Sequence, residues 1–299
     1  MHQSASNSAQ RQRLHDDGEA LYADGREDEA LLKFHAAIAA EPEGAAGSYY
    51  NIGLIHKYRR QWRESFEANL RACALWPDNE AARWNLAIAA TALRDWGSAR
   101  RAWADHGIKL DGEGPVVADF GQTPVRLNPA SSGEVVWARR IDPVRARIES
   151  VPLPDSGHCC GDVVLHDGAS NGRRESGGQS YMVFDVLELF EPSALSTFEL
   201  NIDLPDAQDA ARLVDLLQQA GLHVEDWTAS VKHFCRQCSE GEAHEHAPVA
   251  PDSAWQPARR IGIAATARAT IDPVLRAWEA EGGASGILEC VLDAAELEV

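Results

Sequence analysis

Residues 49–62 read YYNIGLIHKYRRQW, and residues 83–96 read RWNLAIAATALRDW. Both segments carry an aromatic residue, an asparagine, an aliphatic residue and then a small residue, and both end on tryptophan. The small residue also occurs earlier in the chain, so that Gly18, Gly53 and Ala87 follow one another at steps of 35 and 34 residues. A period of this length indicates stacked supersecondary units.

Each unit is predicted to be a pair of amphipathic helices. The first pair covers residues 10–24 and 27–40, with Gly25 between them as a residue that tolerates positive φ. Pro42 ends the second helix, because proline cannot continue the ladder of backbone hydrogen bonds. One such hairpin cannot bury its apolar face alone, so neighbouring hairpins must stack.

The spacing resembles the tetratricopeptide repeat, TPR, whose pattern runs aromatic-x2-Leu-Gly-x2-Tyr, then Ala-x3-Phe-x2-Ala, then Pro. The first unit matches at Gly18, Ala30, Phe34, Ala37 and Pro42, and the second at Tyr49, Gly53, Ala72 and Pro77. The second unit departs from the pattern with Asn69, and the third with Ala87 and Asp111. The resemblance implies a helical solenoid of about three repeats over residues 10–112; an ordinary helical bundle is the alternative.

TPR arrays hold a peptide or protein segment in a concave groove that the first helix of each unit lines. The resemblance therefore implies a peptide-binding groove formed by His15, Glu19, Tyr22, Tyr50, Asn51, Leu54, Lys57, Trp84, Asn85 and Ile88. Any one of these side chains could instead pack between helices.

Some TPR co-chaperones hold a terminal carboxylate with Lys, Asn, Asn, Lys and Arg at set positions of these first helices. Those positions hold His15, Glu19, Asn51, Ala81 and Asn85 in this sequence. Only Asn51 agrees, and Glu19 would repel a carboxylate. The apolar groove candidates, such as Tyr50 and Trp84, favour a more apolar ligand.

Charge and length limit the number of domains and the kinds of partner that this chain can have. The chain has 299 residues, enough for two or three domains, and a formal net charge of −18. No segment carries the basic stripe that nucleic acid or an anionic membrane surface requires, so we expect neither as a partner. The first ten residues lack the apolar core of a secretory signal, no run reaches transmembrane length, and only six cysteines occur. These features predict a cytoplasmic protein.

Two further regions are expected after the repeats. Short alternating runs separated by Gly, Pro, Asn and Asp predict a small β-rich, barrel-like domain over residues 121–192. Residues 194–299 show the order strand, helix, strand twice, which favours a ferredoxin-like α/β sandwich. The whole chain is thus expected to be an α plus α/β multidomain protein.

A possible metal site lies between the two halves of the last domain. Cys235 and Cys238 form a C-x2-C knuckle, and His244 and His246 point the same way in an extended segment. Two sulfur and two imidazole ligands suit tetrahedral zinc, and a site with all four positions filled is structural. A polar loop with incidental Cys and His, or a redox C-x-x-C, are the alternatives.

An enzymatic interpretation rests on weaker signals. Residues 168–172 match G-x-S-x-G, with Ser170 at the nucleophile position. A nucleophile elbow requires a helix directly afterwards, and residues 173–178 are turn-rich instead. His166 and Asp167 could in principle do acid–base work, but beside glycines they are more often turn formers.

Two hypotheses follow. The first is a cytosolic, bacterial-style adaptor whose TPR groove holds a protein segment, with C-terminal domains stiffened by a zinc knuckle. The second is a hydrolase-like or metal-dependent enzyme in the C-terminal half, with the repeats as a docking arm. The sequence names neither the partner nor the pathway.

Overall fold

A computed structural model describes residues 2–131, 133–230 and 255–296 of the chain. These residues form two compact units, Met1–Val117 and Ala118–Val299. The sequence predicts separate regions at 121–192 and 194–299, and the contacts group both in the second unit. Within the described ranges, no helix is both long enough and apolar enough to span a membrane.

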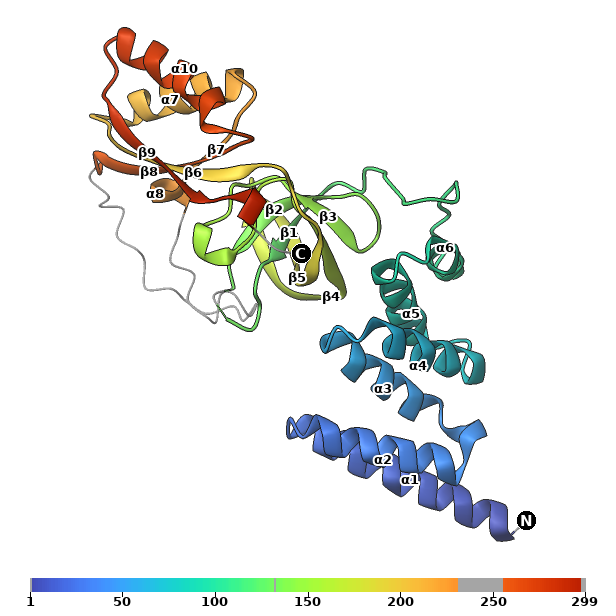
Figure 1. Ribbon diagram of the computed structural model, residues 1–299. Coiled ribbons are helices and arrows are strands. Elements are labelled where there is room, and N and C mark those ends of the chain that lie inside the picture. Colours follow the sequence, from blue (N-terminus) through green and yellow to red (C-terminus); the bar gives the residue numbers. More distant parts are fainter. Residues whose placement is uncertain (1, 132, 231–254, 297–299) are drawn as a thin grey trace. The chain divides into compact units, whose positions relative to one another are not determined.

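The first unit consists of helices that pair as successive hairpins (Figure 1). The helices are α1 (His2–Ala23), α2 (Glu27–Ala40), α3 (Ala46–Tyr58), α4 (Trp62–Leu75), α5 (Glu80–Ala92) and α6 (Trp96–Asp105), with a 3₁₀ turn η1 (Pro42–Gly44) after the first pair. Helix α1 packs on α2, α3 on α4 and α5 on α6, while α2 also contacts α3 and α4 contacts α5. The prediction of TPR-like helical hairpins is confirmed.

The small residues of the repeat mark the closest approach of the two helices in a hairpin. A Cβ atom added at Gly18 would lie 2.6 Å from the ring of Phe34, which is fully buried. In the second hairpin, a Cβ atom at Gly53 would lie 2.3 Å from the amide nitrogen of Asn69. The Ser65 hydroxyl also donates a hydrogen bond to the Gly53 carbonyl over 2.8 Å. The space that glycine leaves is therefore filled by the partner helix.

Local signals end and begin these helices. Gly25 follows α1 with φ of +75°, as the sequence predicts for the turn between the first two helices. Asn79 and Asp95 accept hydrogen bonds from the first turns of α5 and α6, which satisfies N–H groups that have no partner within the helix. Helix α1 begins at His2, eight residues before the predicted start.

The second unit begins with five strands. They are β1 (Gln122–Arg126), β2 (Val135–Arg140), β3 (Arg145–Ile148), β4 (Val163–Ser176) and β5 (Gln179–Glu191), with a 3₁₀ turn η2 (Pro154–Ser156) before β4. Consecutive strands pair antiparallel, and β1 also pairs with β5 in parallel, so the pairing closes on itself. The side chains that point inward include Val125, Val136, Ala138, Ile148 and Val164.

The long hairpin of β4 and β5 corrects the sequence prediction for residues 168–178. That stretch was expected to be a loop, but β4 continues through it to Ser176. The register between β4 and β5 shifts at several points, including between His166 and Ser170 and between Ser170 and Arg173. Bulges of this kind absorb extra residues and let a glycine-containing stretch stay in the sheet.

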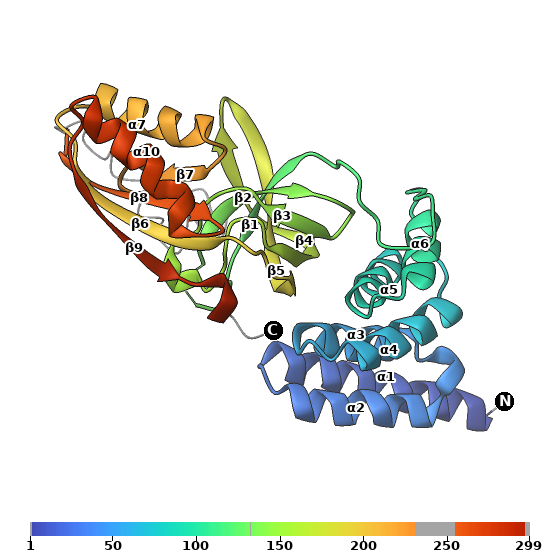
Figure 2. The ribbon, with the colours of Figure 1, turned by 45° about the horizontal axis from the view of Figure 1, so that its top comes forward.

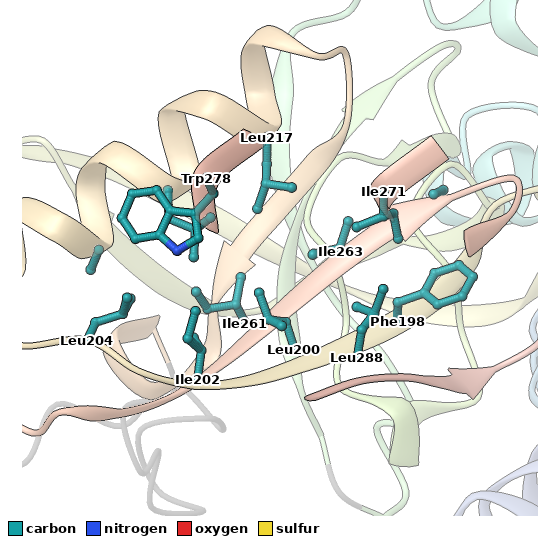
Figure 3. Close-up of a cluster of buried hydrophobic side chains, with 13 residues drawn as sticks. Phe198, Leu200, Ile202, Leu204, Leu217, Ile261, Ile263, Ile271, Trp278 and Leu288 are labelled. Carbon is teal, nitrogen blue, oxygen red and sulfur yellow. The ribbon is translucent and has the colours of Figure 1, made fainter. Parts of the chain in front are cut away.

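A second sheet follows in the order β7-β8-β6-β9. Its strands are β6 (Ser196–Asp203), β7 (His223–Asp226), β8 (Ala258–Ala265) and β9 (Gly286–Leu292), and the helices are α7 (Ala207–Gln219), α8 (Trp227–Ser230), α10 (Arg268–Ala280) and the 3₁₀ turn η3 (Ala294–Glu296). All neighbouring strands are antiparallel. Helices α7 and α10 cover one face, where Leu200, Leu213, Ile261, Ile271 and Trp278 form the core (Figure 3).

The two sheets of this unit share a small core of their own. Trp227 is buried, and its indole N–H donates to the Val151 carbonyl over 2.8 Å. Cys160 and Ala264 complete the cluster from either side. A Cβ atom on Gly262 would lie 2.4 Å from the Trp227 ring, so this glycine makes room for the tryptophan that joins the sheets.

Candidate functional site

Among the first helices of the three hairpins, α3 contacts both α1 and α5 (Figure 2). His15 of α1 lies 3.0 Å from the Ser48 hydroxyl of α3, and the Asn51 amide of α3 donates to Glu19 of α1 over 3.4 Å. Between α3 and α5, the Lys57 ammonium donates to the Asn85 side-chain oxygen over 3.2 Å. We call the surface formed by α1, α3 and α5 the first-helix row. All ten predicted groove residues lie on these three helices.

Four of the ten predicted residues have little or no exposed surface. Asn51 is 9% exposed, Lys57 2%, Asn85 5% and Ile88 0%. A buried ammonium is costly unless it is paired, and Lys57 has the Asn85 oxygen and the face of the Tyr58 ring, whose centroid is 4.4 Å away. Asn51, Lys57 and Asn85 make hydrogen bonds between neighbouring hairpins, and Ile88 is part of the core.

The other six predicted residues keep surface that a ligand can reach. Five are half-buried: His15, Tyr22, Tyr50, Leu54 and Trp84. The sixth, Glu19, has 57% of its side chain exposed. The reachable part of the first-helix row is therefore largely aromatic and aliphatic, with one carboxylate.

The Trp84 ring is held by the third hairpin. It meets Trp103 edge-on at 4.9 Å between ring centroids, and His106 at 5.0 Å in the same manner. Burial lowers the pKa of His106, and the nearby Arg83 guanidinium lowers it further. The neutral imidazole is favoured in this environment, and these ring contacts pack Trp84 against the third hairpin.

The carboxylate of Glu19 contacts one side chain of its own helix and one side chain of α3. The His15 Nε2 atom lies 3.3 Å from Glu19 Oε1, and Asn51 donates to the same oxygen. Tyr22 lies one turn further along α1, and burial raises its pKa, with further contributions from Glu27 and Tyr50. This arrangement places negative charge and aromatic rings at one end of the row.

None of the five positions that hold a terminal carboxylate in some TPR co-chaperones carries a lysine or an arginine in this chain. Asn51 is engaged with Glu19, and Asn85 accepts from Lys57. Ala81 contributes no polar group. A ligand carboxylate would meet the negative charge of Glu19 at this surface.

The second unit contains the residues of the weaker enzymatic interpretation. Ser170 lies within β4, opposite Phe184 of β5, and no helix follows it. His166 is fully buried, and burial lowers its pKa to about 4. Its Nδ1 atom lies 2.7 Å from the Asp167 carbonyl oxygen. The strand-to-helix elbow that a nucleophilic serine requires is therefore absent around Ser170.

The predicted zinc ligands Cys235, Cys238, His244 and His246 lie outside the described residues. Among residues 2–131, 133–230 and 255–296, no group of three or more His, Cys, Asp or Glu side chains is arranged to hold a metal ion. The zinc knuckle stays a prediction from the sequence.

The structural match described here covers about the N-terminal third of the chain. No family model and no curated protein matches the sequence. Among solved structures, the chain is similar to the second TPR domain of Spaghetti (RPAP3) bound to the HSP90 peptide SRMEEVD. The match has 17% sequence identity and a TM-score of 0.33, and it covers 35% of this chain and 95% of that domain.

Two polar contacts could not be predicted from the sequence. The first is between Ser48 and His15, because a serine in a helix does not indicate which side chain it will contact. In the second unit, Glu134 accepts a hydrogen bond from the Leu153 N–H, and burial raises its pKa to about 7. Glu134 directly precedes β2, and its unusual environment comes from burial and from Glu225 of β7, which lies far away in the sequence.

Proposed function

We propose that this chain is a TPR-type protein–protein interaction adaptor whose first-helix row holds a peptide or protein segment. The observation that carries the proposal is the continuity of this row, in which side-chain contacts join α1 to α3 and α3 to α5. A continuous surface of three helices can hold an extended segment along several side chains at once.

The side chains of the row favour recognition of a peptide. Tyr22, Tyr50 and Trp84 are half-buried aromatic residues, and such side chains offer a large contact area at a low cost in conformational entropy. The buried Lys57 and Asn85 hold adjacent hairpins in fixed positions, so binding need not order the helices first.

For the C-terminal half, we propose a supporting role. Its β6–α7–β7 and β8–α10–β9 segments and the antiparallel order β7-β8-β6-β9 support a ferredoxin-like description, with the five-stranded β-rich domain before it. The proposed structural zinc, held by Cys235, Cys238, His244 and His246, rests on ligand type and spacing in the sequence. It would stiffen the segment between β7 and β8.

The adaptor proposal is tested with the full chain and a random dodecapeptide library displayed on phage. Selected peptides are synthesised, and their affinities are measured by fluorescence anisotropy for the parent, for Tyr50→Ala and for Leu70→Ala. Leu70 is a control because it is 49% exposed on α4, away from the first-helix row. We expect Tyr50→Ala to weaken binding by about tenfold or more. Equal affinity of both variants, or the absence of any selected peptide, would reject the proposal.

The zinc proposal is tested by elemental mass spectrometry of the purified full chain. We expect about one zinc per chain, lost together with thermal stability in the Cys235→Ser, Cys238→Ser double variant. Cys73→Ser is the matched control, because Cys73 is a half-buried cysteine of α4 in the other unit. A parent chain without zinc, or a double variant with unchanged melting, would contradict the proposal.

A further inference from the structure

We propose that the first-helix row selects a basic segment, and that Glu19, together with the rings of Tyr22 and Tyr50, receives a lysine or arginine side chain of the partner. This inference rests on the proposed peptide-binding function and adds the chemical class of the ligand. It also sets this chain apart from repeats that take an acidic terminal carboxylate.

The Glu19 carboxylate contacts two neighbouring side chains and remains exposed. Both contacts to it, from Asn51 Nδ2 and from His15 Nε2, are made at Oε1. The side chain nevertheless keeps 57% of its surface exposed. Asn51 itself is 9% exposed, so a nearly buried amide orients the carboxylate from beneath. An incoming cation would meet an acceptor already held in place, which reduces the entropy lost on binding.

Two aromatic residues, Tyr22 and Tyr50, accompany Glu19 in the first-helix row. Tyr22 lies three residues after Glu19, on the same face of α1, and Tyr50 directly precedes Asn51 on α3. Tyr50 is among the groups that raise the pKa of Tyr22, so it lies near that phenol. Both rings are half-buried and keep some surface. A carboxylate one helical turn from a tyrosine is a favourable environment for an ammonium or guanidinium group, through ion pairing and cation–π attraction.

The charges of the first-helix row favour a cationic partner. The nearby cations are engaged: Lys57 is buried against Asn85, and Arg59 pairs with Glu27 and Asp28. Glu19 is thus the exposed charge among the predicted groove residues. The full chain carries −18, which attracts a basic segment over long range and disfavours an acidic one.

The test uses the same random dodecapeptide library against three full-length proteins: the parent, Glu19→Gln and Glu67→Gln. Glutamine keeps an oxygen for the Asn51 hydrogen bond and removes the charge. Glu67 is an exposed glutamate on α4 and serves as the matched control. We expect lysine or arginine to be enriched at one position of the peptides selected by the parent and by Glu67→Gln, and the enrichment to be lost with Glu19→Gln.

A double-mutant cycle then assigns the contact. The best peptide and its Lys→Gln or Arg→Gln version are measured against the parent and Glu19→Gln. We expect either change alone to weaken binding by about fivefold to tenfold, and the second change to add little. Additive losses, acidic enrichment, or a basic preference that survives in Glu19→Gln would overturn the inference. Selection of peptides without any charge preference would overturn it while leaving the adaptor proposal intact, whereas selection of no peptide would reject the adaptor proposal itself.

Discussion

Replacing Glu134 with glutamine probes how the second unit joins its two sheets. The Glu134 carboxylate accepts a hydrogen bond from the Leu153 N–H at 3.1 and 3.2 Å to its two oxygens. Burial raises the pKa of Glu134 to about 7; the Leu153 hydrogen bond and His158 oppose the rise, and the carboxylate of Glu225 on β7 adds to it. Folding therefore strengthens the binding of this proton.

The sign and size of the effect follow from that pKa. A glutamate with a folded pKa of about 7 and an ordinary value of 4.5 binds its proton more tightly in the folded state. Its contribution to stability is fully present below pH 4.5 and is lost as the pH rises through about 7. The loss amounts to about 3.5 kcal/mol at most, since each pKa unit corresponds to about 1.4 kcal/mol. Glutamine avoids the loss because it stays neutral and still accepts from Leu153.

Urea unfolding of the full-length parent and Glu134→Gln at pH 4.5 and pH 8.5 measures this difference. We expect similar free energies of unfolding at pH 4.5 and a variant that is more stable by about 2 to 3 kcal/mol at pH 8.5. Glu175→Gln, an exposed change on β4, should leave both values nearly unchanged. A variant that is less stable than the parent at pH 8.5, or a difference that does not depend on pH, would refute the reasoning.

Three other perturbations are checked by urea unfolding of the full chain. Phe34→Ala should destabilise the first unit by about 3 to 5 kcal/mol, because the ring is fully buried in the space left by a glycine; a loss below 1 kcal/mol would contradict the packing. Gly262→Ala should cost about 1 to 3 kcal/mol, since its Cβ would meet the buried Trp227 ring; a neutral change would count against that contact. His166 has a folded pKa of about 4, below its ordinary value of 6.5, so stability present above pH 6.5 should fall as the pH is lowered through about 4. His166→Gln should flatten that fall by up to about 3 kcal/mol, and an unchanged pH profile would argue against the buried neutral imidazole.

The helical repeat could be predicted from the sequence because its signals are local. A small residue at Gly18 or Gly53 must face a partner helix a fixed number of residues later, and the period alone reveals the hairpins. The order strand, helix, strand that is predicted twice for residues 194–299 is also present, as β6–α7–β7 and β8–α10–β9.

The strands of the second unit were harder to predict because their pairing is not local. Strand β4 continues past His166 only because β5 pairs with it through several register shifts. Strand β1 contains Pro124, which reads as a break in a strand pattern, yet Pro124 lies opposite Trp137 in the ladder. Neither feature has a sequence signal within a short window.

The helices that carry the predicted groove residues could be inferred from the sequence, but the exposure of each residue could not. Helical periodicity assigned the correct helices, whereas burial at each position depends on the neighbouring hairpin. Lys57 and Ile88 were predicted to line the groove, but they are only 2% and 0% exposed. The contact between Asn51 and Glu19 likewise requires two helices from different repeats.

Site-specific photo-crosslinking tests the central claim most directly. Benzoylphenylalanine is introduced at Tyr50, on the first-helix row, or at Leu70, on α4, and each full-length protein is irradiated with a peptide selected from the library. We predict a covalent adduct from position 50 and none above background from position 70. Crosslinking only from position 70, or equal yields from both positions, would show that the peptide binds elsewhere and would contradict the account.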